Sequence, residues 1–546
     1  MVSPAHAPQN SDVTPHDGNE PLTPELARYA FTESGPWVID RDRLDWDVGL
    51  GVIRAALARE VPRLTTPKRI PPLGRLVTVG SRIVWALAGW VVHERRAKDR
   101  GPRMEGLSRR LRQAAEDLGP TYIKLGQIIS SGAGIFPDEL VAQFALLRDK
   151  VPAEDFDVVR QVVETDLGRP LEEVFARFER TPLAAASIAQ VHVATLLTGE
   201  EVVVKVQRPT IRTAVYRDLE VMAWLAPFLI GRIPVSALAN PPALVELFTE
   251  TITEELDFRL EAENMLDVAE VFAHLDQRGF VVARPHPTLV TRRVLVMERL
   301  QGYGWEDIEG MIAAGISGRD VIRTGMVGFT EGAMVHGIFH GDLHGGNLFV
   351  LADGRIALLD FGITARMTEK ERMAFLRLMI TGATGDIKGQ LGAFRDLGAL
   401  PDDVDLDWVI EELRLDGEVF DPTQMSQEEM MAELQRITKA LLGMGARLPK
   451  ILMLYVKNLV FLDGAIATLA PDLDIMAEVM NLFASMAGRH GDVLAAQMGL
   501  LAGEEIAVDE TAVRAAFGMT EEDPNPLTHE ELRRRRDMIR GRMGKR

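Results

Sequence analysis

Cysteine is absent from all 546 residues of the sequence. This absence excludes disulfide bonds, thiolate metal sites and cysteine nucleophiles, and it fits a reducing compartment without requiring one. An excess of basic charge is missing as well, because the formal net charge is −19 at pH 7. Binding to nucleic acid depends on a basic surface that displaces counterions from the phosphates, so the charge balance argues against a nucleic-acid partner.

A secretory signal is also missing. Residues 1–22 are rich in Pro, His, Asn and Asp, and they contain neither a basic start nor an apolar run. We predict that this segment is a disordered tail. The whole chain, with 47% hydrophobic and 26% charged residues, has the composition of a folded globular protein, and its length suggests two to four structural units.

No early apolar run has the length and freedom from charge that indicate a membrane span. The most apolar one, residues 76–92, contains Arg82 and is shorter than the roughly 20 residues that a spanning helix needs. We therefore favour a helix packed on the main domain. Trp85 and Trp90, with basic residues on both flanks, keep a helix in the membrane interface open as an alternative, and a true span is the third.

Two later segments also have alternative interpretations. Residues 451–469 are strongly apolar, but Lys457 and Asp463 lie inside the segment and favour a buried core helix over a span. Residues 529–546 are rich in arginine and lysine, which indicates a solvated tail, with contact to an anionic membrane or a partner as the alternative. We expect a cytoplasmic bacterial protein, with peripheral association at the inner membrane as the alternative.

Hydrophobic periodicity divides the chain into helical and β-rich parts. Two β-branched runs, residues 188–195 and 201–206, flank a Thr-Gly-Glu turn and predict a hairpin. Residues 348–359 predict a second hairpin with an Asp-Gly turn. The units that we predict are a helical linker region (23–103), a helical extension (104–180), a β-rich lobe (181–300), a helical lobe (301–490) and a C-terminal region (491–546).

The strongest chemical signal is a pair of motifs in the helical lobe. Residues 340–347 read HGDLHGGN, and Asp-Phe-Gly follows at residues 360–362 after the second hairpin. Phosphoryl transfer needs metal ions that neutralise the phosphates and a carboxylate beside the accepting group. Magnesium prefers oxygen ligands of this kind. We therefore predict that Asp342 is catalytic and that Asn347 and Asp360 bind the metal ion.

The two histidines of this loop raise the question of a zinc site. His340 and His344 are four positions apart, which is a ligand spacing on a helix. Glycines interrupt any helix here, so zinc is disfavoured and we predict that His340 holds the loop in place.

A lysine in the middle of an apolar strand is the second signal. Lys205 lies within the run VVVKV, where an unpaired ammonium is costly to bury. A kinase-like site supplies two anions for such a lysine, namely the nucleotide phosphates and a glutamate on a helix. Residues 253–258, which read TEELDF, contain the candidate glutamate. An edge-strand lysine that faces solvent is the alternative.

A glycine-rich phosphate loop is missing before Lys205. Residues 182–192 read PLAAASIAQVH, so alanines stand where an ordinary kinase has glycines. Each Cβ restricts positive φ and the close approach of the backbone to phosphate. By composition alone, Ala184, Ala185 and Ala186 read as the start of a helix.

These motifs together resemble the UbiB/AarF family of atypical protein-kinase-like proteins, which includes the mitochondrial ADCK-type members. The resemblance covers roughly residues 105–475. The most specific match is the family's K-x-G-Q signature, which ordinary kinases lack and which stands here at residues 124–127. Gly345 replaces the proline of the family's catalytic loop, and Ala189 replaces a glycine. Residues 130–137 lack the Arg and Asp that the family carries after K-x-G-Q.

The resemblance implies an α+β, bilobal protein-kinase-like fold with a mostly helical C-lobe, in which the helical extension caps the active site. ATP and Mg²⁺ are the cofactors that it implies. Its E-x-D motif matches residues 255–257 and makes Glu255 the partner of Lys205. The remaining residues implied are Ala184, Ala185, Ala186 and Ser187 in the nucleotide loop, Glu298 to Leu300 at the hinge, and Lys124, Gln127 and Asp257 in the cap.

The function implied is that of an ATP-dependent ATPase or small-molecule kinase in quinone or isoprenoid lipid metabolism, with a lipid, a quinone precursor or a membrane surface as partner. One alternative is a phosphotransferase of the choline or aminoglycoside type, which shares a similar H-G-D-x-H-x-x-N loop. The other is a nucleotide-binding scaffold with little turnover. An ordinary protein kinase is disfavoured, because residues 363–367 enter a helical pattern at once and no Ala-Pro-Glu motif follows.

Overall fold

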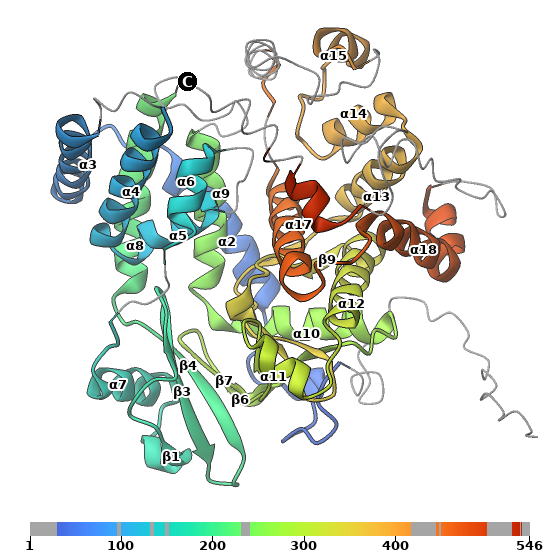
Figure 1. The fold of residues 1–546 in the computed structure, drawn as a ribbon. Coiled ribbons are helices and arrows are strands. Elements are labelled where there is room, and N and C mark those ends of the chain that lie inside the picture. The colour runs from blue at the N-terminus through green and yellow to red at the C-terminus, as the bar shows by residue number, and fades with distance from the viewer. Residues whose placement is uncertain are drawn as a thin grey trace, which may run out of the picture.

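The computed structural model describes residues 30–94, 100–130, 136–147, 152–230, 241–415, 440, 444–446, 449–498, 527–534 and 537. The tail predicted for residues 1–22 and most of the basic C-terminal segment lie outside these ranges. Figure 1 shows a sheet lobe at the lower left, a layer of helices above it and the C-terminal helices at the right.

A six-stranded sheet forms the first lobe, in the order β1-β3-β4-β7-β6 with β2 paired to β3. The predicted hairpin is β3 and β4, and Gly199 in its turn adopts φ +103°. Side chains alternate along β4, so Val202, Val204 and Val206 pack against α7, whereas Lys205 faces the opposite side of the sheet. The strands are β1 (Phe175–Phe178), β2 (Ala184–Ala185), β3 (Ala189–Leu196), β4 (Glu201–Gln207), β6 (Pro285–Val290) and β7 (Val294–Glu298).

Helices precede and interrupt this sheet. The extension predicted as helical for residues 104–180 contains helices up to residue 167, but Phe175–Phe178 forms strand β1, so the end of the predicted extension belongs to the sheet. Pro120 begins one of these helices, where its missing N–H costs nothing. The elements are η1 (Arg41–Arg43), α2 (Leu50–Thr65), α3 (Leu73–His93), α4 (Arg100–Leu118), α5 (Pro120–Ser130), α6 (Asp138–Phe144), α7 (Phe156–Leu167), η2 (Leu171–Glu173), α8 (Ile211–Leu229), α9 (Pro241–Glu255) and α10 (Phe258–His274).

Two helices, α9 and α10, follow each other closely within the predicted β-rich lobe. Asp257 separates the two helices with extended backbone, and its side chain accepts a hydrogen bond from the Arg259 N–H at the start of α10. A new helix axis therefore begins at Phe258. The change in direction matters for the site, because the two helices present different glutamates.

The second lobe is mainly helical with short strands around the predicted loop motifs. Its elements are β5 (Phe280–Val282), β8 (Tyr303–Gly304), α11 (Ile308–Ala313), α12 (Gly318–Glu331), η3 (Gly332–His336), β9 (Ile338–His340), η4 (Gly345–Asn347), β10 (Leu348–Val350), β11 (Ile356–Leu358), β12 (Thr364–Arg366), α13 (Glu369–Thr384), α14 (Ile387–Asp396), α15 (Leu406–Leu413), α17 (Lys450–Leu469) and α18 (Ile475–Met498). The predicted second hairpin is β10 and β11.

The helical pattern expected for residues 363–367 is wrong. Thr364–Arg366 forms strand β12, which pairs with β9 and places Thr364 opposite His340. Non-local pairing with β9 overrides the local pattern here. The helix starts only at Glu369, behind a capping box in which Thr368 and Glu371 bond each other's backbone N–H.

Residues 30–46 form a strap along the back of the sheet strands. Two tryptophan indoles donate to β6 backbone carbonyls, Trp37 to Pro285 and Trp46 to His286, each at 3.0 Å. The Val282 N–H donates to the Ala30 carbonyl at 2.9 Å. The strap therefore joins the two lobes behind the hinge between them.

Two described helices, α3 and α17, are long and apolar enough to cross a membrane by length and composition. Half of the apolar stretch of α17 is buried inside the protein, which agrees with the predicted core helix. Only 11% of the stretch in α3 is buried, through Val79 and Ala86. The expectation of a packed helix therefore holds for one side of α3 alone.

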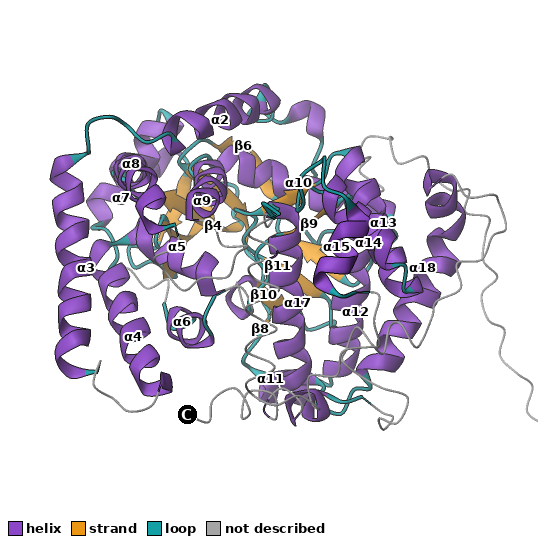
Figure 2. Ribbon diagram, turned by 90° about the horizontal axis from the view of Figure 1, so that it is seen from above, coloured by secondary structure: helices purple, strands orange, loops and turns teal. Residues whose placement is uncertain are grey.

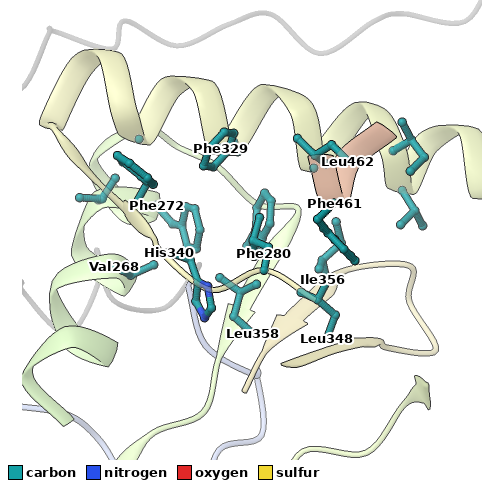
Figure 3. A pocket seen from close by; sticks show the side chains of 18 of the residues that line it. Val268, Phe272, Phe280, Phe329, His340, Leu348, Ile356, Leu358, Phe461 and Leu462 are labelled. Carbon is teal, nitrogen blue, oxygen red and sulfur yellow. The ribbon is translucent and has the colours of Figure 1, made fainter. Parts of the chain in front are cut away.

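An apolar pocket of about 40 Å³ lies in the core of the second lobe. Figure 3 shows phenylalanine side chains from α10, β5, α12 and α17 around it, with His340 at its edge. Two glycines of α12, Gly325 and Gly328, line the pocket, and the space beside each of them differs. A Cβ built on Gly325 meets Leu462 at 3.7 Å, an ordinary contact, whereas a Cβ on Gly328 lies 2.2 Å from a Phe280 ring carbon.

Substituting these two glycines with alanine should have opposite effects. We expect Gly325→Ala to raise the free energy of unfolding by about 1 kcal/mol, because it removes a helix-interior glycine and fills space in the pocket. Gly328→Ala should lower it by about 1–3 kcal/mol, because Phe280 must move. Urea unfolding of both variants measures the difference, and the same sign for both would contradict this description of the pocket.

Candidate active site

A buried ion cluster lies where the two lobes meet. The Lys205 ammonium on β4 donates to Glu261 on α10 at 2.7 Å and to Asp360 after β11 at 3.1 Å. The Lys205 and Glu261 side chains are 13% and 4% exposed, whereas Asp360 is 45% exposed. The cluster is therefore shielded from solvent at Glu261 on α10 and accessible to solvent at Asp360.

The charges of this cluster stabilise one another. Burial alone lowers the pKa of Lys205, but Asp360 and Glu261 outweigh it and raise that pKa. Burial alone raises the pKa of Asp360, but the Lys205 and Lys124 ammonium groups outweigh it and hold that pKa well below its usual range. Lys205 is thus a fixed cation and Asp360 a fixed anion at neutral pH.

Helix α10 positions the Asp-Phe-Gly segment. The Asn264 amide donates to the Phe361 carbonyl at 2.8 Å, one turn beyond Glu261 on the same helix. The Gly362 N–H donates to the Asp360 carboxylate at 2.9 Å and helps to fix its position. One helix therefore holds both the partner of the strand lysine and the backbone beside the open carboxylate.

The catalytic-loop motif is held by hydrogen bonds from two directions. The His340 ring accepts from the Asp342 N–H at 3.1 Å, and its other nitrogen bonds the Asp360 carbonyl. Burial lowers the pKa of His340, so the ring is neutral. From α17, Asn458 accepts from the Leu343 N–H at 3.0 Å and donates to the His340 carbonyl. His340 therefore has the structural role that the sequence predicted.

Asn347 and Asp360 stand at the same end of the β10–β11 hairpin. Leu348 pairs with Leu358, and the Leu359 N–H donates to the Asn347 carbonyl at 3.0 Å. The Asn347 amide donates to the Asp342 carbonyl at 3.1 Å, which leaves its own oxygen as an acceptor. The hairpin thus brings a carboxylate and an amide oxygen together.

This pair of oxygens fits a magnesium ion. The described residues contain no group of three or more His, Cys, Asp or Glu side chains able to hold a metal. Magnesium does not need such a group, because it is usually bound by one or two carboxylates together with substrate phosphates and water. A half-exposed Asp360 beside Asn347 matches that ligand set.

The Asp342 carboxylate is paired with Lys457 from α17. Both side chains are largely buried, with exposed fractions of 16% and 13%. Burial alone raises the pKa of Asp342, but Lys457 and Lys124 outweigh it and hold that pKa well below its usual range. A carboxylate with so low a pKa is a weak base, and it is better suited to accept a hydrogen bond and orient a group than to remove a proton.

Lys124 reaches into the site from α5 and pairs with Glu255 at 3.0 Å. Glu255 was expected to hold Lys205, and this expectation is wrong, because Glu261 holds Lys205 instead. Glu255 ends α9, whereas Glu261 lies beyond the turn at Asp257, on helix α10, which packs against β6 and β7. Burial, which Lys124 only partly offsets, raises the pKa of Glu255 to about 7.

The alanine-rich segment is a strand and not the start of a helix. Ala184 and Ala185 pair with β3, and the Ala186 N–H donates to the Ala189 carbonyl at 2.8 Å. None of the three alanines adopts positive φ, so their Cβ atoms carry no strain. Ser187, which follows them, is buried.

The remaining predicted site residues have mixed surroundings. Asp257 pairs with Arg259 at 2.7 Å, so its side chain belongs to the turn between α9 and α10. The Glu298 carboxylate pairs with Arg284 at 3.0 Å and also accepts a hydrogen bond from the Thr32 hydroxyl of the strap. Its side chain therefore stabilises the fold, although the sequence predicted that it contacts the nucleotide. Leu300, after β7, remains the candidate hinge position, and Gln127 lies on α5 three residues after Lys124.

Sequence reasoning missed Glu261, Lys457 and Asn458. A signal for Glu261 was present, because it lies at helical spacing from Phe258 and Met265, so a carboxylate stands in a buried apolar stripe. Asn458 gives a similar signal, because it is 0% exposed and lies four residues before the buried Leu462 on the same face of α17. A polar group in a buried stripe needs a partner, but only the fold shows which partner it finds.

Comparison with known proteins agrees with this geometry. A family model described as the ABC1 atypical kinase-like domain matches residues 146–391. An uncharacterised protein of Mycobacterium tuberculosis is 32% identical over 82% of this chain and 93% of its own length. A Vibrio parahaemolyticus protein named probable protein kinase UbiB is 30% identical over 68% of each chain. The chloroplastic protein ACTIVITY OF BC1 COMPLEX KINASE 1 of Arabidopsis thaliana is 31% identical over 68% of this chain and 54% of its own length.

The fold and the site define an α+β protein-kinase-like protein with a mostly helical second lobe and an added helical layer. The chain belongs to the ABC1 atypical kinase-like family, whose members include UbiB and aarF domain-containing proteins. Its relatives include bacterial and chloroplastic proteins.

The pair of Lys124 and Glu255 yields a prediction on stability and pH. In the folded protein Glu255 has a pKa of about 7, above its ordinary value of 4.5. The folded state therefore holds this proton more tightly, and the contribution of Glu255 to stability falls as pH rises from about 4.5 to about 7. Glutamine does not titrate, so Glu255→Gln should lack this loss. We expect the unfolding free energy of the variant, measured by urea unfolding, to increase relative to that of the wild type as pH rises through this window.

The neighbouring substitution Glu254→Gln is the matched control, because Glu254 is 31% exposed and lies 3.6 Å from Lys450. A second comparison uses Lys124→Met. Without the ammonium, the pKa of Glu255 should rise further, so the glutamate is protonated at neutral pH and the substitution should cost about 1–3 kcal/mol, the size of a lost hydrogen bond to a charged group. Adding Glu255→Gln should recover part of that loss. Purely additive effects, or a pH dependence shared by Glu254→Gln, would contradict the pairing.

Proposed function

We propose that this protein is an ATP- and Mg²⁺-dependent phosphotransfer enzyme, either an ATPase or a kinase of small molecules. The observation that carries the proposal is the Lys205 ammonium held between the buried Glu261 at 2.7 Å and the partly exposed Asp360 at 3.1 Å. A buried strand lysine fixed by a helix glutamate is the arrangement that orients nucleotide phosphates in kinase-like sites.

The charge balance of the site supports dependence on a divalent ion. Three lysines meet four carboxylates, namely Lys124, Lys205 and Lys457 with Glu255, Glu261, Asp342 and Asp360. The cluster carries one negative charge when Glu255 is ionised and none when Glu255 is protonated, so in neither state does it attract a triphosphate by net charge. A bound divalent cation makes the net charge positive, so Asp360 and Asn347 would hold Mg²⁺, which neutralises phosphate charge.

Each remaining group has a role that its contacts support. Lys205 would bind the phosphates on the nucleotide side, and Leu300 would lie at the hinge. Asp342, whose basicity Lys457 reduces, would accept a hydrogen bond from the acceptor and orient it. Lys457 would then lie at the terminal phosphate, where negative charge must be stabilised during transfer. Its ammonium is the cation that contacts Asp342 directly.

The class of acceptor is a further part of the proposal. Lys124 from the helical layer enters the cluster and pairs with Glu255, so this layer stands beside the phosphate site. Such a cover favours a small or lipid-like acceptor over a folded protein substrate, in line with the resemblance to proteins of quinone and isoprenoid lipid metabolism. A nucleotide-binding regulator with low turnover is the second candidate, and the ion pair that occupies Asp342 favours it.

Substitutions of the two aspartates should separate binding from turnover. We expect Asp360→Asn to abolish Mg²⁺-dependent nucleotide binding, because it removes the open carboxylate. Asp342→Asn should leave nucleotide affinity within a few-fold and lower phosphate release by about 10²-fold, the size of the loss when a reacting group is misplaced. Calorimetric titration with ATP and a phosphate-release assay measure the two effects.

Asp353→Asn is the matched control, because Asp353 lies on the same β10–β11 hairpin, half exposed, and pairs with Arg355. It should change neither quantity. Unchanged ATP binding by Asp360→Asn would refute the enzyme proposal, whereas equal phosphate release by Asp342→Asn and the wild type would favour the regulator.

Lys457 should discriminate between nucleotides. We expect Lys457→Met to weaken ATP binding roughly tenfold or more, the size of a lost charge-assisted hydrogen bond, with little change for ADP. Lys457→Arg should restore part of the ATP affinity. Lys388→Met is the control, because Lys388 forms an exposed ion pair with Asp407. Equal losses for ATP and ADP would place Lys457 away from the terminal phosphate.

A further inference from the structure

Helix α3 presents an apolar face that the described part of the protein leaves uncovered. Its outward side chains include Val77, Val84, Trp85 and Val92, with exposed fractions of 67%, 63%, 77% and 70%. Figures 1 and 2 both show α3 at the outer edge of the molecule, with α4 on its inner side. Exposed valines and a tryptophan in one row are unusual on a protein surface that meets only water.

The sequence segment that contains α3 has a charge opposite to that of the whole chain, although Lys68, Arg75 and Arg82 each pair with a carboxylate from outside the segment. No Asp or Glu occurs between Glu60 and Glu94, whereas the chain as a whole carries a net charge of −19. The segment contains five basic residues, namely Arg63, Lys68, Arg69, Arg75 and Arg82. Arg63 and Arg69 are exposed and pair with no described residue. The apolar face therefore lies within a locally basic segment.

Contacts on the inner side fix the orientation of α3. The Arg75 guanidinium pairs with Asp218 on α8 at 2.6 Å, and Arg82 pairs with Asp117 on α4 at 2.9 Å. The Trp90 indole donates to the Arg103 carbonyl on α4 at 2.9 Å. These contacts lie along the length of the helix, so α3 is attached sideways to α4 and α8. A helix attached along its length to α4 and α8 can lie in the plane of a membrane surface, but it is not free to cross the membrane.

We propose that the outer face of α3 docks on an anionic lipid bilayer, with the helix in the plane of the headgroups. The apolar side chains would enter the headgroup and acyl boundary, and Trp85 suits that depth. The exposed arginines would meet acidic headgroups, each worth about 1 kcal/mol near the surface. The absence of carboxylates from the docking segment removes the repulsion that the rest of this acidic chain experiences.

This surface is connected to the candidate active site through the helical layer. Helix α3 packs on α4, and Gly119 alone separates α4 from α5, which carries Lys124. A membrane bound at α3 would thus lie against the same layer that inserts a lysine between the carboxylates. The docking surface itself does not depend on the phosphotransfer proposal.

Vesicle binding by the full chain tests the proposal. We expect the protein to float with vesicles of phosphatidylcholine mixed with phosphatidylglycerol and to bind vesicles of phosphatidylcholine alone much less. The double variant Val84→Glu/Trp85→Glu should lose about tenfold or more in affinity, because two carboxylates enter the interface. The double variant Arg63→Gln/Arg69→Gln should reduce the preference for anionic lipid.

Leu197→Glu is the matched control, since Leu197 is 59% exposed at the β3–β4 turn, and it should bind vesicles like the wild type. All these positions are exposed, so the thermal midpoints should not change. A chain that lacks residues 529–546 should still bind if α3 is the contact.

Three outcomes would overturn the proposal. One is a wild-type protein that binds neither kind of vesicle. The second is binding that survives Val84→Glu/Trp85→Glu and disappears with residues 529–546. The third is a wild-type dimer in light scattering that this variant converts to monomers without any vesicle binding, because α3 would then cover a second copy of the chain. Nucleotide binding, measured in parallel, separates these results from a failure of the phosphotransfer proposal.

Discussion

The structure depends on one buried ammonium group. Lys205 stands in an apolar strand where an uncompensated charge would cost several kcal/mol, and the fold supplies two carboxylates to it from segments far apart in the chain. Satisfying this lysine requires Glu261 on α10 and Asp360 after the β10–β11 hairpin to reach the same point beside β4. The need to pair one cation therefore constrains how the lobes meet, and it leaves Asp360 partly exposed to solvent.

The helical layer adds a second charge pair to the same cluster. Lys124 pairs with Glu255, and its charge also helps to keep Asp342 and Asp360 ionised. The site is thus a network in which each charge sets the protonation of its neighbours, and removing one member alters the rest. Attachment of α3 to α4 places an apolar, locally basic face on the outside of this layer, so surface and site share one rigid support.

Several features were predictable because local chemistry determines them. The turn at Gly199, the Asp-Gly turn at residues 353–354 and the prolines at helix starts fix both hairpins and the order of helices. The motifs of residues 340–347 and 360–362 place Asn347 and Asp360 at one end of the hairpin that joins them, and Asp342 lies in the same short loop as Asn347. The wrong predictions concern segments whose structure depends on pairing with distant residues. The local pattern of residues 363–367 is helical, for example, but pairing with β9 makes Thr364–Arg366 the strand β12.

The sequence by itself determined that a lysine in an apolar strand needs an anion, that Asn347 and Asp360 flank one hairpin, and that no Asp or Glu lies between Glu60 and Glu94. Only the tertiary structure decided which anion the lysine meets. Glu255 and Glu261 are six positions apart on a chain that turns at Asp257, so a small change in helix direction sends one to Lys124 and the other to Lys205. The pairing of Asp342 with Lys457 and the exposure of the apolar face of α3 were likewise decided by packing between distant segments, which no local pattern encodes.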